Sequence, residues 1–203
     1  MDIYRFDESY REKGFAMIAG IDEAGRGPIA GPVVASAVIL PPDARFDGLD
    51  DSKVVPEKKR RALFYQIVAR ALSVGVGISG VDDIERLNIL GATKLAMKSA
   101  VSQLAPAPDL LLLDAVSLPD LEIEQSSHIK GDSRSASIAA ASIVAKYVRD
   151  RLMLCYHREF PVYGFDRHKG YGTKEHMELV RKHGPCPQHR MSFRGVRQDG
   201  LLF

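Results

Sequence analysis

Apolar residues along this chain fall into short runs of strand length and longer stripes with helical spacing. Two runs rich in β-branched residues lie near the start, at 17–23 and 33–40, and each predicts a buried strand. The Gly/Pro-rich segment between them is too short for a crossover helix, so we expect the two strands to be antiparallel neighbours. A further run at 109–114, DLLLLD, is typical of a central strand that is buried on both faces.

The remaining periodic segments predict helices and shorter strands around these runs. Helices are predicted at 56–72, 89–104, 133–154 and 174–183, and strands at 74–79 and 128–131, the latter at a sheet edge. The third helix contains the small-residue run SIAAAS, which predicts very close packing against the sheet. Antiparallel strands followed by alternating helices and strands predict an α/β fold, a mixed β-sheet flanked by helices.

Length and composition exclude several classes of protein. A chain of 203 residues, 45% hydrophobic and 27% charged, fits one large domain, or one domain with a short appendage. No apolar run reaches the roughly 18 residues of a membrane helix. The N-terminal residues mix both charge signs and predict no secretory signal. Two cysteines, Cys155 and Cys186, make no disulfide framework, so we expect a cytoplasmic protein.

Charge is distributed unevenly between the two parts of the chain. Residues 1–127 carry a net charge of −5, whereas residues 128–203 carry +7 and all six histidines. A basic C-terminal part indicates a polyanionic partner held at one end of the molecule. A solvated basic surface would give the same charge pattern, and charge alone does not separate the two.

Four acidic residues stand at the ends of predicted elements. Asp22 and Glu23 close the first strand, and Asp114 closes the apolar run at 109–114. Asp132 lies just before the small-residue helix, whose N-terminus favours the ionised carboxylate. If the strands ending at Glu23 and Asp114 are neighbours, the acids converge and require a cation between them, and oxygen ligands favour Mg²⁺ or Mn²⁺. The alternative is that acids end strands because turns are polar, and the pattern leaves both open.

Three polar loops offer groups that suit a phosphate or a sugar. In the GRG loop at 25–27, glycines permit close backbone approach and the arginine suits a phosphate, and a tight turn is compatible with this interpretation. Tyr171, between two glycines, is placed to stack on a sugar or base, with Lys169 nearby for a phosphate, although packing is the commoner role of such a tyrosine. Lys53 offers either a phosphate contact or a polar turn.

The segment AGIDEAGRGPIAGPVVASAVIL at 19–40 closely resembles the signature of the type 2 ribonucleases H, specifically bacterial ribonuclease HII. The resemblance continues in order along nearly the whole chain, through 48–53, 87–97, 111–119, 130–153, 163–173 and 184–193. It implies the ribonuclease H-like fold. We expect a catalytic domain at 1–160 and, packed on it, a small helical C-terminal extension at 161–203 that binds substrate.

The resemblance also implies an activity and a set of site residues. The activity is that of an endoribonuclease that hydrolyses the RNA strand of RNA–DNA hybrids and incises duplex DNA 5′ of embedded ribonucleotides, by two-metal-ion catalysis with Mn²⁺ or Mg²⁺. The products would carry 5′-phosphate and 3′-hydroxyl ends, and the reaction would start ribonucleotide excision repair. The implied catalytic and metal-binding set is Asp22, Glu23, Asp114 and Asp132. The expected substrate-binding residues are Gly25, Arg26, Gly27 and Tyr171, with Lys53 and Lys169 as candidate phosphate contacts.

The chain departs from the family pattern at a few positions. Ala115 stands where glycine is frequent, 54–56 lacks the serine that often caps the following helix, and 194–195 replaces Ala-Pro. Two other functions remain open: a DNA junction nuclease on the same fold, and a non-catalytic nucleic-acid-binding module. We expect a monomer, with the segment GLLF at 200–203 as a candidate for binding a replication clamp or as a simple apolar tail.

Overall fold

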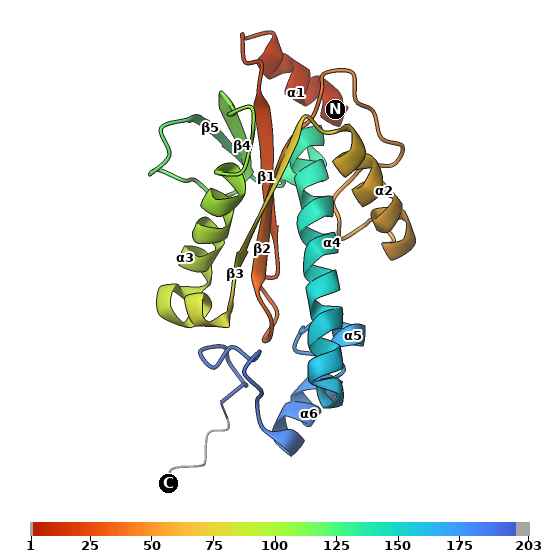
Figure 1. The fold of residues 1–203 in the computed structure, drawn as a ribbon, viewed down its shortest axis with the longest axis vertical. Helices are drawn as coiled ribbons and strands as arrows, with labels where there is room; N and C mark the ends of the chain where they lie inside the picture. Colours follow the sequence, from red (N-terminus) through yellow and green to blue (C-terminus); the bar gives the residue numbers. More distant parts are fainter. Residues whose placement is uncertain (1, 198–203) are drawn as a thin grey trace.

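Five strands form one sheet in the order β3-β2-β1-β4-β5 in the computed structural model, which describes residues 2–197 (Figure 1). The strands are β1 (Ile18–Ala24), β2 (Val33–Ile39), β3 (Ser73–Ser79), β4 (Leu110–Asp114) and β5 (Glu124–His128). β1 pairs antiparallel with β2 and parallel with β4, which confirms the predicted mixed sheet and its antiparallel first pair. β4 is buried on both faces, as its apolar run predicts.

Helices cover both faces of this sheet. They are α1 (Ile3–Arg11), α2 (Glu57–Arg70), α3 (Val81–Val101), α4 (Ala136–Glu159), α5 (Phe165–His168) and α6 (Lys174–His183), with 3₁₀ turns η1 (Gly131–Ser133) and η2 (Pro161–Tyr163). Figure 1 shows α3 on one face and α4 along the other, with α2 packed outside α4. No helix in residues 2–197 is long and apolar enough to cross a membrane.

The small residues of α4 let this helix lie almost in contact with the backbone of β1. A Cβ atom added at Gly20 would lie 2.0 Å from the carbonyl carbon of Ser137, which is far inside van der Waals contact. Ser36 of β2 donates its hydroxyl to the carbonyl of Ala141 at 2.8 Å, so the same approach continues along the helix. The predicted close packing is confirmed, and it places the end of β1 directly against α4.

Four elements differ from the sequence prediction, and one of them is the single-turn helix α5, which was not predicted. The edge strand is 124–128 rather than 128–131, and its sequence, EQSSH, carries no apolar alternation because β5 is half-exposed and pairs through its backbone. α3 begins at Val81, but Asn88, with φ 60° and ψ 172°, is not helical and divides it into two pieces, of which only the second, from residue 89, was predicted; the Asn88 side chain caps that piece by accepting hydrogen bonds from the N–H groups of Leu90 and Gly91. α1 was not predicted; its buried Asp7 accepts hydrogen bonds from the start of α4.

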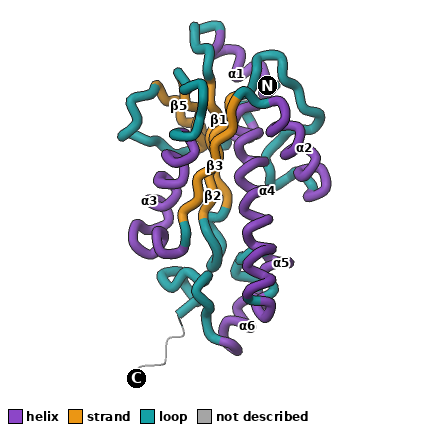
Figure 2. Tube along the Cα trace, in the orientation of Figure 1, coloured by secondary structure: helices purple, strands orange, loops and turns teal. Residues whose placement is uncertain are grey.

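Beyond α4, the chain folds back onto the end of that helix and onto the loop between β1 and β2. This contact buries a separate hydrophobic cluster, which consists of Ala30, Met153, Tyr163, Phe165, Val180 and Cys186. Figure 2 shows the loops of this region between the sheet and helices α5 and α6. The division into a domain at 1–160 and an extension at 161–203 stays a prediction, and the candidate clamp segment 200–203 lies outside the described residues.

Candidate active site

The ends of β1 and β4 bring carboxylates to one edge of the sheet. Asp22 and Asp114 are the residues that directly follow the last pair of the β1–β4 ladder. Because the two strands are parallel, these residues lie side by side, and Glu23 follows Asp22 along β1. Oδ1 of Asp114 accepts the N–H of Gly131 at 2.9 Å, which draws η1 and Asp132 against the end of β4. The structure therefore brings the four predicted acids together, and their catalytic role stays a prediction.

Burial and mutual repulsion oppose the ionisation of these acids. Burial raises the pKa of Asp22 well above its ordinary value, the charge of Glu23 raises it further, and a hydrogen bond from Ser142 acts in the opposite direction. Burial also raises the pKa of Glu23, against the lowering effect of Arg26, whose Nη1 lies 3.2 Å from the Glu23 carboxylate. Such a cluster gains from a cation that binds among its oxygens.

The environment of Asp132 contradicts one sequence expectation. A helix N-terminus was expected to favour the ionised form, yet the pKa of Asp132 is raised, first by burial and then by the charges of Asp51 and Asp114. The physical reason is that Asp132 lies inside the short turn η1, within the acidic cluster, and α4 begins only at Ala136. Neighbouring negative charge and burial outweigh the helix dipole.

The donor set fits a hard divalent cation. Oε2 of Glu23 is buried and has no hydrogen-bond partner within residues 2–197, and an unpartnered buried carboxylate oxygen is costly unless an ion binds it. All candidate ligands are carboxylate oxygens, which Mg²⁺ and Mn²⁺ prefer. Within residues 2–197, no three Asp, Glu, His or Cys side chains lie close enough together to form a complete metal site. Because like charges repel, a bound cation would favour a closer approach of these carboxylates.

Two buried arginines bind the backbone of the loop 25–32, which we call the glycine loop. They are Arg149 of α4 and Arg190 near the C-terminus. Arg190 donates to four loop carbonyls at 2.6 to 3.2 Å, those of Gly25, Arg26, Pro28 and Gly31. Arg149 donates at 3.0 to 3.1 Å to the carbonyls of Ala30, Pro32 and Lys169. Burial, and then the charge of Arg149, lower the pKa of Arg190 to about 9, so it stays protonated at neutral pH. The two guanidinium groups make this loop rigid.

Sequence reasoning missed both arginines. Neither forms an ion pair with a carboxylate in the described part of the chain, and both have an exposed fraction of 0%. In a sequence they look like members of the basic C-terminal part, whose arginines are mostly solvated. The one available signal was Arg149 inside a helix face of small and apolar residues, where a cation needs buried acceptors.

The same scaffold brings Tyr171 to the glycine loop. The N–H of Ile29 donates to the carbonyl of Gly170 at 2.9 Å, and a Cβ atom on Gly27 would lie 3.9 Å from the Tyr171 ring. Gly170 has φ +84°, and a Cβ atom there would lie 2.5 Å from the carbonyl oxygen of Ala30, so only glycine fits. The Tyr171 ring remains 45% exposed and available for stacking.

The two candidate lysines lie in different surroundings. The Nζ of Lys53 lies 3.8 Å from Oδ2 of Asp132 and 3.9 Å from Asp51, and its side chain is exposed. Lys53 therefore reaches over the acidic cluster. The ammonium of Lys169 instead donates to the carbonyl of Asp166. The backbone of Lys169 is what connects this residue to the site: its φ is 51°, and its carbonyl oxygen accepts a hydrogen bond from Arg149.

A buried chain of hydrogen bonds connects the C-terminal histidines to the tyrosine loop. The N–H of Cys186 donates to Nδ1 of His189 at 2.9 Å, and Nε2 of His189 lies 3.1 Å from Nε2 of His176. Nδ1 of His176 lies 2.8 Å from the carbonyl oxygen of Tyr171. One set of neutral tautomers satisfies every bond: His189 donates from Nε2, and His176 donates from Nδ1. Burial lowers the pKa of each ring to about 4.

Acid is expected to destabilise the protein through these two rings. In the unfolded chain they bind protons below about pH 6.5, but in the folded chain only below about pH 4, so stability falls as the pH drops between those values. The loss amounts to about 2 kcal/mol per ring at about pH 5. Urea denaturation at about pH 7 and 5 measures it. The variant His189→Gln should show a smaller fall than the wild type, and the exposed-site control His183→Gln the same fall; equal falls in all three proteins would contradict the prediction.

The mixed five-stranded sheet flanked by helices, with carboxylates at the ends of adjacent parallel strands, is that of the ribonuclease H-like fold. The fold is similar to that of ribonuclease H2 from Pyrococcus horikoshii OT3, with a TM-score of 0.74 and 24% identity over 89% of this chain and 95% of that one. It is also similar to a structure of the PCNA:RNase HII complex from Archaeoglobus fulgidus, with a TM-score of 0.74 and 24% identity, over 92% of this chain and 98% of that one.

Sequence comparison identifies the family. The family model of ribonuclease HII matches residues 19–196. The ribonuclease HII of Acetivibrio thermocellus is 54% identical over 93% of this chain and 73% of its own length. That of Geotalea daltonii is 53% identical over 97% of this chain and 91% of its own. The chain belongs to the ribonuclease HII family, and it is a metal-dependent endoribonuclease.

Proposed function

We propose that this chain cleaves the RNA strand of RNA–DNA hybrids and incises duplex DNA 5′ of single embedded ribonucleotides. The observation that carries the proposal is the convergence, at one sheet edge, of four carboxylates with a backbone-held glycine loop and an exposed tyrosine. The carboxylates suit phosphodiester hydrolysis, whereas the loop and the ring suit discrimination of the sugar. Membership of the ribonuclease HII family supports the same substrate.

The acids act in this proposal as ligands. Asp22, Glu23, Asp114 and Asp132 would hold two divalent ions, whose positive charge would serve to activate a water and to stabilise the departing 3′-oxygen. Lys53, over the acidic cluster, would bind the phosphate and offset its charge. The products would carry 5′-phosphate and 3′-hydroxyl ends.

The glycine loop and Tyr171 recognise the sugar in this proposal. Only the 2′-hydroxyl distinguishes a ribonucleotide from a deoxynucleotide at one position, so a reader of this group needs rigid donors and acceptors. The backbone of Gly25, Arg26 and Gly27 meets that need because Arg190 fixes two of its carbonyls. Tyr171, beside Gly27, would stack under the sugar of the following deoxynucleotide and leave no room for a second hydroxyl.

Finer features of the function follow as proposals. We infer Mn²⁺ or Mg²⁺ as the ion; a ribonuclease HIII from Bst with a similar fold, at a TM-score of 0.67, has been solved in complex with Mn²⁺. We infer a cytoplasmic monomer that acts in ribonucleotide excision repair. A sliding clamp is the proposed partner, in line with the clamp complex of the Archaeoglobus fulgidus protein.

Gel-resolved cleavage of a labelled DNA duplex with one embedded ribonucleotide tests the proposal. We expect a single cut 5′ of the ribonucleotide with Mg²⁺ or Mn²⁺, no cut with EDTA, and no cut in an all-DNA duplex of the same sequence. A 2′,3′-cyclic phosphate product would contradict the mechanism. Cleavage of branched all-DNA substrates would favour the junction nuclease, and binding without any cleavage would favour the non-catalytic module.

A further inference from the structure

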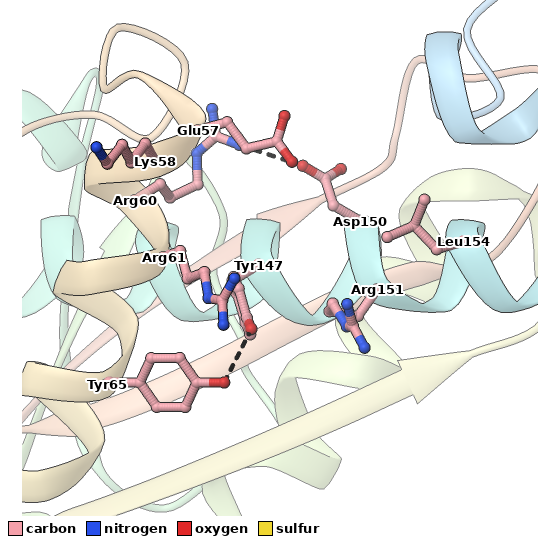
Figure 3. A pocket seen from close by; sticks show the side chains of 9 residues that line it. All are labelled: Glu57, Lys58, Arg60, Arg61, Tyr65, Tyr147, Asp150, Arg151 and Leu154. Atoms are coloured by element: carbon pink, nitrogen blue, oxygen red, sulfur yellow. Dashed lines mark hydrogen bonds and ion pairs between the residues drawn. The ribbon is translucent and has the colours of Figure 1, made fainter.

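A cavity of about 770 Å³ lies between α2 and α4, outside the carboxylate cluster (Figure 3). Its walls come from the first turns of α2 and from the middle of α4, where positions 147, 150, 151 and 154 repeat at helical spacing on one face. Figure 3 shows Lys58, Arg61 and Arg151 spread along this α2–α4 groove rather than converging on one point. None of the residues assigned above to catalysis or sugar recognition lines it.

The groove carries positive charge that the protein itself does not neutralise. In the described part of the chain, Lys58, Arg61 and Arg151 form no ion pair with a carboxylate, and all three are exposed. Two acids line the groove: Glu57, which is exposed, and Asp150, which is engaged at 3.2 Å by Arg60 and at 2.6 Å by Lys146. Against these two acids stand four cations, Lys58, Arg60, Arg61 and Arg151, so the lining keeps a net charge of +2. The surplus of cations indicates an anionic ligand that spans the groove.

Two tyrosines form a polar floor between these cations. The hydroxyl groups of Tyr65 and Tyr147 lie 3.3 Å apart, and the ring of Tyr147 stacks on Phe64 with centroids 4.1 Å apart. The hydrogen bond to Tyr147, and then the charges of Arg61 and Arg151, lower the pKa of Tyr65. Paired hydroxyls beside guanidinium groups are the donors that phosphate oxygens accept from.

Neighbouring residues of α4 connect the groove to the proposed substrate site. Lys146, which binds Asp150 in the groove wall, also holds its ammonium over the ring of Tyr171, 5.9 Å from the centroid. Ser142, one turn earlier on α4, contacts Asp22. From Ser142 to Asp150 the helix advances about 12 Å, which corresponds to about three to four base pairs of a duplex.

We propose that the α2–α4 groove is a second contact with the substrate and binds the phosphate backbone of the flanking duplex about three to four base pairs from the scissile phosphate. The distance in base pairs rests on the proposed function, because it is counted from the scissile phosphate. Consecutive phosphates would be bound by Arg61, Arg151 and Lys58 together with the tyrosine hydroxyls. This binding is independent of cleavage. The spread of the cations along the groove favours a backbone over a single free nucleotide.

Cleavage of duplexes of different length tests the contact. The wild type and Arg61→Ala/Arg151→Ala are compared on duplexes with one ribonucleotide that extend about 2 or about 12 base pairs on its 5′ side or on its 3′ side, with about 12 base pairs on the other side in each case. We expect the variant to raise KM about tenfold on the long duplexes of one side, with kcat and short-duplex cleavage changed less than about twofold. The control Arg5→Ala/Lys94→Ala, which removes two positive charges from α1 and α3, should match the wild type. An equal loss on short and long duplexes would overturn the proposal.

Binding of an all-DNA duplex in EDTA separates this proposal from the proposed function, since it needs neither ribonucleotide nor cleavage. The slope of log Kd against log salt should fall by about 2 in the variant, one for each lost phosphate contact, and remain unchanged in the control. Unchanged slopes in both would overturn the groove contact even if cleavage were confirmed. The last experiment is competition between the duplex and a free nucleoside triphosphate. If the nucleotide displaced the duplex and duplex length had no effect, the groove would be a site for free nucleotide, which would contradict a backbone contact.

Discussion

Asparagine in place of Asp22 is expected to reduce cleavage by about a thousandfold or more, which corresponds to roughly 4 kcal/mol of transition-state stabilisation. The substitution keeps the shape and one oxygen acceptor, but it removes the charge that a divalent ion needs. Asp22 lies at the centre of the cluster, buried and in electrostatic contact with Glu23 and Asp114. The measurement is single-turnover cleavage of a ribonucleotide-containing duplex at saturating Mg²⁺ or Mn²⁺.

The same substitution is expected to raise the stability of the metal-free protein. Because burial and the charge of Glu23 raise the pKa of Asp22, the ionised carboxylate destabilises the fold at neutral pH, and a neutral amide does not. We expect a gain of about 1 kcal/mol, or roughly 2 to 4 °C in Tm, in the presence of EDTA. Added Mn²⁺ should raise the Tm of the wild type and raise that of the variant much less.

Asp109→Asn is the matched control. Asp109 precedes the opposite end of β4, where its carboxylate accepts the N–H groups of Ala16 and Met17 at 2.7 and 3.0 Å. Its loss should lower stability by about 1 kcal/mol and leave kcat within about twofold of the wild type. If Asp22→Asn retained more than about a tenth of wild-type cleavage, Asp22 would not be an essential metal ligand.

Alanine in place of Arg190 is expected to produce the largest loss of stability, about 3 to 5 kcal/mol. The side chain is fully buried and donates to the carbonyls of Gly25, Arg26, Pro28 and Gly31. Truncation leaves these acceptors without their donor and leaves a cavity in place of the guanidinium. Because the same carbonyls belong to the glycine loop, cleavage at single ribonucleotides should also be lost at temperatures where the variant is still folded.

Two further variants separate the roles of charge and geometry at this position. Arg190→Lys keeps the positive charge but replaces a planar fork by a point donor, so it should recover less than half of the lost stability. Arg194→Ala, four residues further on and exposed, removes an arginine without a buried acceptor and should change stability by less than about 0.5 kcal/mol. Urea denaturation measures all three. A lysine variant as stable as the wild type would show that charge alone holds the loop.

Much of the sheet could be predicted from the sequence because periodicity reports burial. β1, β2 and β4 are apolar on the faces they bury, and the short Gly/Pro connection predicted the antiparallel pair. β5 escaped because a half-exposed edge strand, EQSSH, is held by backbone pairing that leaves no apolar pattern. The first piece of α3 was missed because the non-helical Asn88 ends it after about two turns, which is too short for a clear apolar stripe. Ala115 has a φ of 51°, a left-handed conformation that glycine adopts more easily and that no residue pattern announces.

By itself, the sequence determined which chemistry is available: four acids at the ends of elements, a glycine loop, and a tyrosine between glycines. These are local features, and residue type with spacing is enough to find them. The tertiary structure alone decided how they are held, because Arg149 and Arg190 bind the glycine loop across more than a hundred residues of chain. It also decided the ionisation of Asp132, for which burial and the charges of Asp51 and Asp114 outweigh the helix dipole. Long-range burial and summed charge depend on which segments meet in space, and no local pattern of residues contains that information.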